Sequence, residues 1–268
     1  MNTIAYEIDE KKTELQFPGS IAEMNGEQLI AAARHILSGG DIPDGDLAIL
    51  TGLPADVVPL LSPFQLFSIR QMFDFLHTSG RDDLNFKEWK IDTISVDGEQ
   101  WYGPLGNFAN ITWEEFVYID QCFINGLHQA MVAAMFRPER DGYNGETDRR
   151  IPFTAFGTSN RFSKLDGCDP AVITAILLNY CAMRRASLET AYPQIFPQGR
   201  TTDPSDDDTE ADFTDEAVDE STGTFSWTKV HRNLMGDNIQ DEDKYLRLNV
   251  HTVLYRLNRL ITENRKHN

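Results

Sequence analysis

Histidine, glutamate and glycine residues are the groups whose types and spacing could support catalysis, and they form no recognisable catalytic or metal-binding pattern. No two of the six histidines lie one helical turn apart, as a helical zinc site requires. Glu114 and Glu115 are adjacent, so on a helix they point in different directions and cannot form a facing acid–base pair. Nucleophile-elbow, phosphate-loop and dinucleotide fingerprints are also missing. The sequence therefore predicts a non-enzyme without a catalytic, cofactor-binding or metal site.

Two charged clusters remain as candidate binding features. Five arginines could grip an acidic partner or balance the chain's own carboxylates: Arg137, Arg140, Arg149, Arg150 and Arg161. The acidic run from Asp206 to Glu210 lacks the glycine and terminal glutamate of a calcium-binding EF-hand loop, which indicates a solvated charged segment. A formal net charge of −18 opposes binding to a phosphate backbone, because such binding rewards clustered Lys and Arg. We therefore expect a protein partner and no nucleic acid.

The composition predicts a globular protein. A chain of 268 residues that is 41% hydrophobic can bury a sizeable core. The longest apolar run, Ala171 to Met183, is too short to span a bilayer. The first residues carry acids and lack the basic start and apolar run of a secretory signal. We expect a cytoplasmic protein with no membrane partner, and the sequence leaves its oligomeric state open.

Helical patterns must provide most of the scaffold that positions these residues. The clearest pattern runs from Ile111 to Arg140, where Thr112 and Glu115 form a capping box and Pro138 ends the helix. The segment between residues 137 and 164 predicts an irregular loop or a small strand. Further helices are expected at residues 27–37, 63–78, 169–185, 225–234 and 249–264. The helix at 63–78 carries so many aromatic residues that we expect it to be largely buried.

Two segments predict β-hairpins. Apolar and polar residues alternate from Ile4 to Phe17 around a polar break, and from Lys90 to Tyr102 around an Asp97-Gly98 pair. Between Thr201 and Gly223 the chain has ten acidic residues and no Lys or Arg, which indicates a disordered linker. The predicted fold class is mainly α, a helical core with one or two short β-hairpins and a long acidic loop before the C-terminal helices.

These patterns also predict the domain organisation. Residues 1–200 form a mainly helical core domain, residues 201–223 form the acidic linker, and residues 224–268 form a C-terminal helical pair. The sequence leaves open whether this pair docks on the core.

Four segments carry a resemblance to a known group of proteins. Phe17 to Leu37 has a proline-led segment before a glutamine-containing helix, and Tyr102 to Phe123 has a Gly-Pro turn before a Thr-led helix. Leu127 to Arg140 ends in an aromatic-Arg-Pro motif, and Trp227 to Leu260 joins a Trp helix, a Gly-Asp turn and a final helix. In this order they resemble tailed-bacteriophage and prophage proteins associated with tail assembly, described as tail assembly chaperone-like.

The resemblance implies a non-enzymatic role in the bacterial host cytoplasm. Such a protein would shield a tail component, for example the long helical tape-measure protein, before the tail tube closes around it. Apolar residues near Phe136 and Trp227, together with Arg137 and Arg140, would then form the partner-binding groove. This chain departs from the pattern in two places: Met135-Phe136-Arg137-Pro138 replaces a more usual Leu-Tyr-Arg-Pro, and its acidic segment is more extreme.

Three other functions are compatible with the sequence. The first is a virion structural protein. The second is an acidic inhibitor that mimics DNA, which would need regular rows of carboxylates on rigid helices. The third is an enzyme whose pocket gathers His, Asp, Glu and Arg from distant segments.

Overall fold

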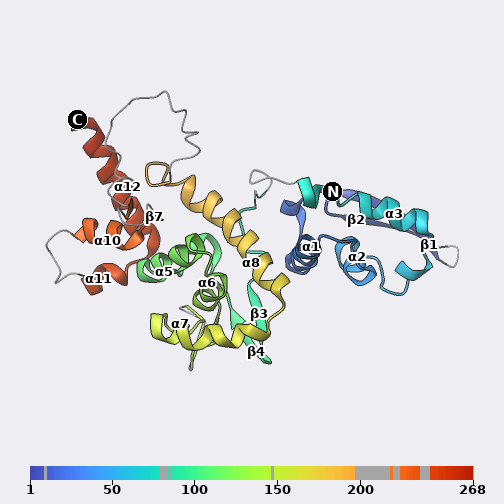
Figure 1. The fold of residues 1–268 in the computed structure, drawn as a ribbon, viewed down its shortest axis with the longest axis horizontal. Coiled ribbons are helices and arrows are strands. Elements are labelled where there is room, and N and C mark those ends of the chain that lie inside the picture. Colours follow the sequence, from blue (N-terminus) through green and yellow to red (C-terminus); the bar gives the residue numbers. More distant parts are fainter. Residues whose placement is uncertain are drawn as a thin grey trace. The chain divides into compact units, whose positions relative to one another are not determined.

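A computed structural model describes residues 1–8, 11–78, 84, 86–145, 148–196, 218–219, 224–235 and 242–267 (Figure 1). It is mainly helical with short antiparallel strands, which confirms the predicted fold class. The chain divides into two compact units. Unit 1 comprises Met1–Ile91 and Gly167–Met183, and unit 2 comprises Asp92–Asp166 and Arg184–Asn268. The predicted division at residues 200 and 224 is therefore not the one that the contacts define.

Unit 1 begins with the predicted hairpin. Strand β1 (Asn2–Ile8) pairs antiparallel with β2 (Lys11–Phe17), with Ile4 opposite Leu15. Phe17 at the end of β2 is fully buried, and its ring lies 5.5 Å from that of Phe73. The hairpin is thereby anchored to the helical part of unit 1.

Three helices form the core of unit 1. Helix α1 (Gly26–Ser38), at the place of the helix predicted for residues 27–37, begins with a capping box between Asn25 and Gln28, and Gly39 is its C-cap. Helix α8 (Pro170–Met183) and helix α2 (Asp44–Thr51) both pack against α1. Buried Asn179 of α8 accepts hydrogen bonds from the backbone amides of Lys90 and Ile91 at 2.7 and 3.1 Å. This amide side chain therefore ties the two chain segments of unit 1 together.

The helix predicted at residues 63–78 is two helices. Helix α3 (Pro63–Gln71) is followed by a turn at Met72–Asp74 and by the short α4 (Phe75–Thr78).

Short 3₁₀ turns of the chain occupy Ile21–Glu23, Val58–Leu60, Gly106–Phe108 and Ser163–Gly167, and a π-helical turn occupies Arg184–Glu189.

Unit 2 contains the second predicted hairpin. Strands β3 (Thr93–Val96) and β4 (Glu99–Tyr102) pair around Asp97 and Gly98, whose φ angles of 51° and 80° suit a tight hairpin turn. A third strand, β5 (Arg137–Pro138), pairs with β4.

The prediction of one long helix from Ile111 to Arg140 is wrong, because this segment contains two helices. Helix α5 (Trp113–Ile124) and helix α6 (His128–Met135) are separated at Gly126, which has a φ of 70° that breaks a right-handed helix. Only half of the predicted capping box forms, because Thr112 Oγ1 accepts a hydrogen bond from the Glu115 amide but the Glu115 carboxylate pairs with Arg137 and Arg150 instead. The segment predicted to be irregular contains helix α7 (Ala155–Phe162), which Thr154 caps.

The C-terminal helices dock on unit 2. Helices α10 (Trp227–Met235), α11 (Glu242–Leu246) and α12 (Val250–His267) each contact α5. A short pair of strands, β6 (Val218–Asp219) and β7 (Thr224–Phe225), precedes them. The rest of the predicted acidic linker, residues 201–223, lies outside the described residues.

Candidate functional site

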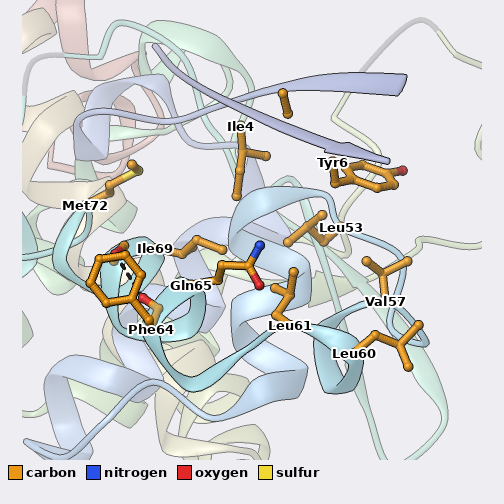
Figure 2. Close-up of a pocket in the computed structure, with 12 residues that line it drawn as sticks. Ile4, Tyr6, Leu53, Val57, Leu60, Leu61, Phe64, Gln65, Ile69 and Met72 are labelled. Atoms are coloured by element: carbon orange, nitrogen blue, oxygen red, sulfur yellow. Dashed lines mark hydrogen bonds between the residues drawn. The ribbon is translucent and has the colours of Figure 1, made fainter. Parts of the chain in front are cut away.

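Unit 1 contains an apolar groove. It lies between β1 and α3 and has a volume of about 590 Å³ (Figure 2). None of the residues that line this β1–α3 groove is charged. They are Ile4, Ala5, Tyr6, Leu53, Val57, Leu60, Leu61, Phe64, Gln65, Ser68, Ile69 and Met72.

Strand β1 supplies one wall of the groove. Because side chains alternate between the faces of a strand, Ile4 and Tyr6 lie on the same face. Figure 2 shows both side chains directed toward the residues of α3 and of the preceding turn. The alternating sequence of β1 thus gives the groove an aliphatic and an aromatic contact.

A proline-rich turn supplies the floor and one rim. Pro54 and Pro59 keep residues 53–61 from continuing as a regular helix, so the segment forms a turn and a short 3₁₀ helix. Leu53 and Val57 are buried and form the floor, whereas Leu60 is 76% exposed at the rim. The same short segment therefore provides both a solid base and an accessible apolar edge.

Helix α3 supplies the opposite wall, and its start is fixed by its sequence. Ser62 and Gln65 form a reciprocal capping box with distances of 2.8 and 3.3 Å, and Pro63 occupies the first turn. Residues 64, 65, 68, 69 and 72 follow helical spacing, so they share one side of the helix and its following turn.

The prediction that this helix is largely buried is wrong. Ile69 is buried, but Phe64 is 78% exposed, Phe67 is 57% exposed and Met72 is 41% exposed. The apolar residues of the helix are spread over more than one side of it, and the small core of unit 1 covers only the side of Ile69. The remaining side is an exposed apolar surface of the kind that commonly marks an interaction site.

Unit 1, which contains the groove, is acidic on balance. Unit 1 has about twice as many Asp and Glu as Lys and Arg residues in its sequence, so its field favours cationic partners. Asp56 is exposed next to the lining residue Val57. The groove therefore combines an uncharged apolar interior with surroundings that attract Lys and Arg.

A smaller hollow of about 200 Å³ lies in the same unit and includes a histidine pair. The Nε2 atoms of His35 and His77 are 2.8 Å apart, a distance that needs one ring to donate a hydrogen bond and the other to accept it. Burial and the neighbouring His77 lower the pKa of His35, while Asp41 opposes that shift. Among the described residues, no three His, Cys, Asp or Glu side chains are arranged to hold a metal ion.

The residues predicted to bind a partner lie in unit 2, and three of the four are in its core. Phe136, Arg137 and Trp227 each have 1% of their surface exposed or less, so the prediction that they line an open groove is wrong. Arg140 is half-exposed, and its backbone amide donates to the Arg149 carbonyl oxygen at 2.9 Å. None of these residues lines the β1–α3 groove.

The predicted arginine cluster mainly balances the chain's own carboxylates. Arg137 and Arg150 both pair with Glu115 Oε1 at 2.9 Å, and all three side chains are almost fully buried. Arg150 also pairs with Asp148 at 2.8 Å. Burial alone would raise the pKa of Asp148, but the hydrogen bonds and charge of Arg150 hold it below its usual value. Of the two roles that the sequence left open, charge balance is the one seen for Arg137 and Arg150.

Trp227 is an anchor of the C-terminal helices. Its Nε1 donates a 2.6 Å hydrogen bond to Asp120 Oδ2, and its ring packs edge-on against Trp113 and Phe116 with centroids 5.5 and 5.1 Å away. Such aromatic packing favours docking of α10 on α5. Its large apolar surface is already used within the protein.

Comparisons with protein-family models, with curated proteins and with solved structures find no match to this chain. In the described part of the chain, the helices include none that is both long enough and apolar enough to cross a membrane. The groove is therefore interpreted from its own geometry.

The wide spread of apolar residues in Pro63–Gln71 was a sequence signal for an exposed apolar surface, but it was interpreted as a sign of burial. Pro63, Phe64, Leu66, Phe67 and Ile69 spread the apolar side chains of this helix over a wider arc than one core can cover. Alternation in β1 indicated an inner face with Ile4 and Tyr6, but it did not indicate that part of this face stays uncovered.

Proposed function

We propose that this protein is a non-enzymatic, chaperone-like assembly factor of a phage or prophage tail, acting in the bacterial cytoplasm. In this proposal the β1–α3 groove holds an apolar segment of a tail protein. The observation that carries the proposal is the exposed apolar wall of the groove, above all Phe64 at 78% and Leu60 at 76% exposure. Full burial of such a side chain contributes about 1.5–3 kcal/mol, so a few contacts can hold a partner segment.

The polar groups of the groove favour a protein segment over a small metabolite. Metabolite sites place several polar groups so that they fix the orientation of a ligand. Here Gln65 Oε1 accepts a hydrogen bond from the Ser62 amide, and Ser68 Oγ donates to the Phe64 carbonyl oxygen. Both groups are engaged within the α3 segment, and apart from them and the Tyr6 hydroxyl the lining side chains are apolar, so apolar contact is the main source of affinity.

The tape-measure protein is the partner that the resemblance suggests. Its apolar helical stripes would aggregate before assembly, and a chaperone that covers them would need an apolar surface and high solubility. The groove supports the first requirement, and the net charge of −18 supports the second. The acidic surroundings also favour partner segments that carry Lys or Arg.

Co-purification with a co-expressed tape-measure fragment tests the proposal. Phe64→Asp should abolish capture, because the carboxylate would be desolvated in an apolar contact. Phe156→Asp is the matched control, since Phe156 is also 78% exposed but lies on α7 of unit 2. Thermal unfolding of each variant checks that the fold is retained. Equal capture by native protein and Phe64→Asp would reject the groove as the binding site.

A further inference from the structure

Three consecutive residues of β1, Ile4, Ala5 and Tyr6, line the groove. Side chains of Ile4 and Tyr6 lie on one face, and the side chain of Ala5 lies on the other. Because Ala5 also lines the hollow although its side chain lies on the other face, the groove reaches the backbone of β1.

The register shows which backbone groups lie at the outer edge of β1. Ile8 pairs with Lys11 across two intervening residues, and the pair that closes such a hairpin exchanges hydrogen bonds. Hydrogen-bonded pairs alternate along an antiparallel ladder, so Tyr6 and Ile4 also bond to β2. The amide and carbonyl groups of Ala5 must then point away from β2.

The outward side of β1 has no further strand among the described residues. Its sheet consists of β1 and β2 alone, and no backbone hydrogen bond to Ala5 is present outside that ladder in the described chain. An open strand edge of this kind is a template for another extended segment.

We infer that the partner segment binds before it forms its helix, in an extended conformation, as an added strand along β1, with alternate apolar side chains entering the β1–α3 groove. This inference rests on the proposed function and specifies its binding mode. Main-chain hydrogen bonds to Ala5 supply a sequence-independent contribution, and the groove selects apolar side chains. A stretch of about five or six residues matches the usual length of a strand.

Charge favours a cationic partner over a second copy of the chain. Each copy has a net charge of −18, so pairing of two β1 edges would bring two strongly acidic molecules together. A segment with Lys or Arg on both sides of its apolar stretch would instead meet the acidic surroundings of unit 1. The inferred occupant is therefore an extended apolar segment with basic flanks.

Peptide binding to the full chain tests the inference. The probe is a fluorescein-labelled peptide with alternating valine and threonine residues and two lysines at each end. Ala5→Pro removes the outward amide but no ladder hydrogen bond, whereas the control Ala5→Val keeps the amide. We expect Ala5→Pro to weaken binding about tenfold or more, and Ala5→Val to change it less than about twofold.

Two further probes keep the test decisive if Ala5→Pro perturbs the hairpin. A peptide N-methylated at alternate residues should bind native protein about tenfold more weakly, because it lacks the amide donors. A helix-forming peptide of leucine, alanine and lysine should bind more weakly than the extended one. Tighter binding of the helical peptide, or equal binding of the N-methylated one, would overturn the added-strand mode.

The outcomes separate this inference from the proposed function. If the extended peptide fails to bind while Phe64→Asp still abolishes tape-measure capture, the groove is a partner site and only the strand mode is wrong. If Phe64→Asp has no effect on capture, the proposed function fails as well. A dimer in light scattering that Ala5→Pro converts to monomers would identify a second copy as the occupant and reject the inferred one.

Discussion

The indole Nε1 of Trp113 in α5 donates a 2.9 Å hydrogen bond to Nδ1 of His231 in α10. The bond requires a lone pair on Nδ1, so the imidazole must be neutral there. Burial lowers the pKa of His231, and Glu242, 3.8 Å from Nε2, partly opposes the shift. The attachment of α10 to α5 therefore depends on a histidine that resists protonation.

Acid should weaken unit 2 through His231. In the unfolded chain this imidazole has its ordinary pKa near 6.5, and in the folded chain its pKa is lower. As pH falls below that ordinary value, the unfolded state binds more protons and the free energy of unfolding decreases. His231→Gln keeps a hydrogen-bond acceptor but does not titrate, so it should lose less stability between pH 7.5 and 5.5. Urea titrations at both pH values measure this, and parallel losses in the two proteins would contradict it.

The buried ion cluster should respond strongly to removal of one charge. Glu115→Gln leaves Arg137 and Arg150 without their shared carboxylate, which should cost about 3–5 kcal/mol of unfolding free energy. Glu139→Gln is the control, because Glu139 and its partner Arg149 are each 44% exposed. It should cost less than about 1 kcal/mol. Similar losses in the two variants, measured by chemical denaturation, would show that burial of the cluster is not decisive.

Close backbone contact should make Gly26 intolerant of any side chain. A Cβ atom at Gly26 would lie 2.3 Å from the Lys90 carbonyl oxygen, so Gly26→Ala must shift the backbone. A destabilisation of about 1–3 kcal/mol is expected. Gly45→Ala in α2 meets no atom within 4 Å and should instead stabilise by up to about 1 kcal/mol. Melting temperatures that shift in the same direction would refute this contrast.

Phe64 should matter for binding but not for folding. At 78% exposure its replacement by serine should change the free energy of unfolding by no more than about 0.5 kcal/mol. Phe73 is 1% exposed, and Phe73→Ala should cost about 3–5 kcal/mol. Denaturant titration of both variants checks the difference. A large loss for Phe64→Ser would mean that the groove wall is part of the core.

Local sequence signals predicted turns and helix ends well, because one or two residues determine the backbone conformation there. Asp97-Gly98 formed the expected hairpin turn, Thr112 capped its helix, and Gly39 ended α1. Gly126 is the exception, because a glycine inside an apolar repeat is compatible with either a continuous helix or a break. The structure contains the break.

Local sequence patterns could not predict where the candidate site lies. Phe64 and Phe136 both belong to apolar stretches of the sequence, yet Phe64 is exposed and Phe136 is buried. The difference comes from tertiary partners: Phe136 packs against Gly103, where an added Cβ would lie 2.8 Å from its ring, whereas Phe64 is left on the uncovered side of α3. Spacing along the chain shows which residues share a face but not which faces find a partner.

The assignment of α8 to unit 1 has a consequence for biosynthesis. Lys90 and Ile91 need Asn179 for their amide hydrogen bonds, so the N-terminal unit cannot be completed when residue 91 leaves the ribosome. The nascent chain must first extend through residues 92–166 and then deliver α8 to α1. Until that moment, the surface of α1 that α8 covers is open to water and to other chains. A protein proposed to protect a partner's apolar segments thus has an apolar segment of its own to protect while it is being made.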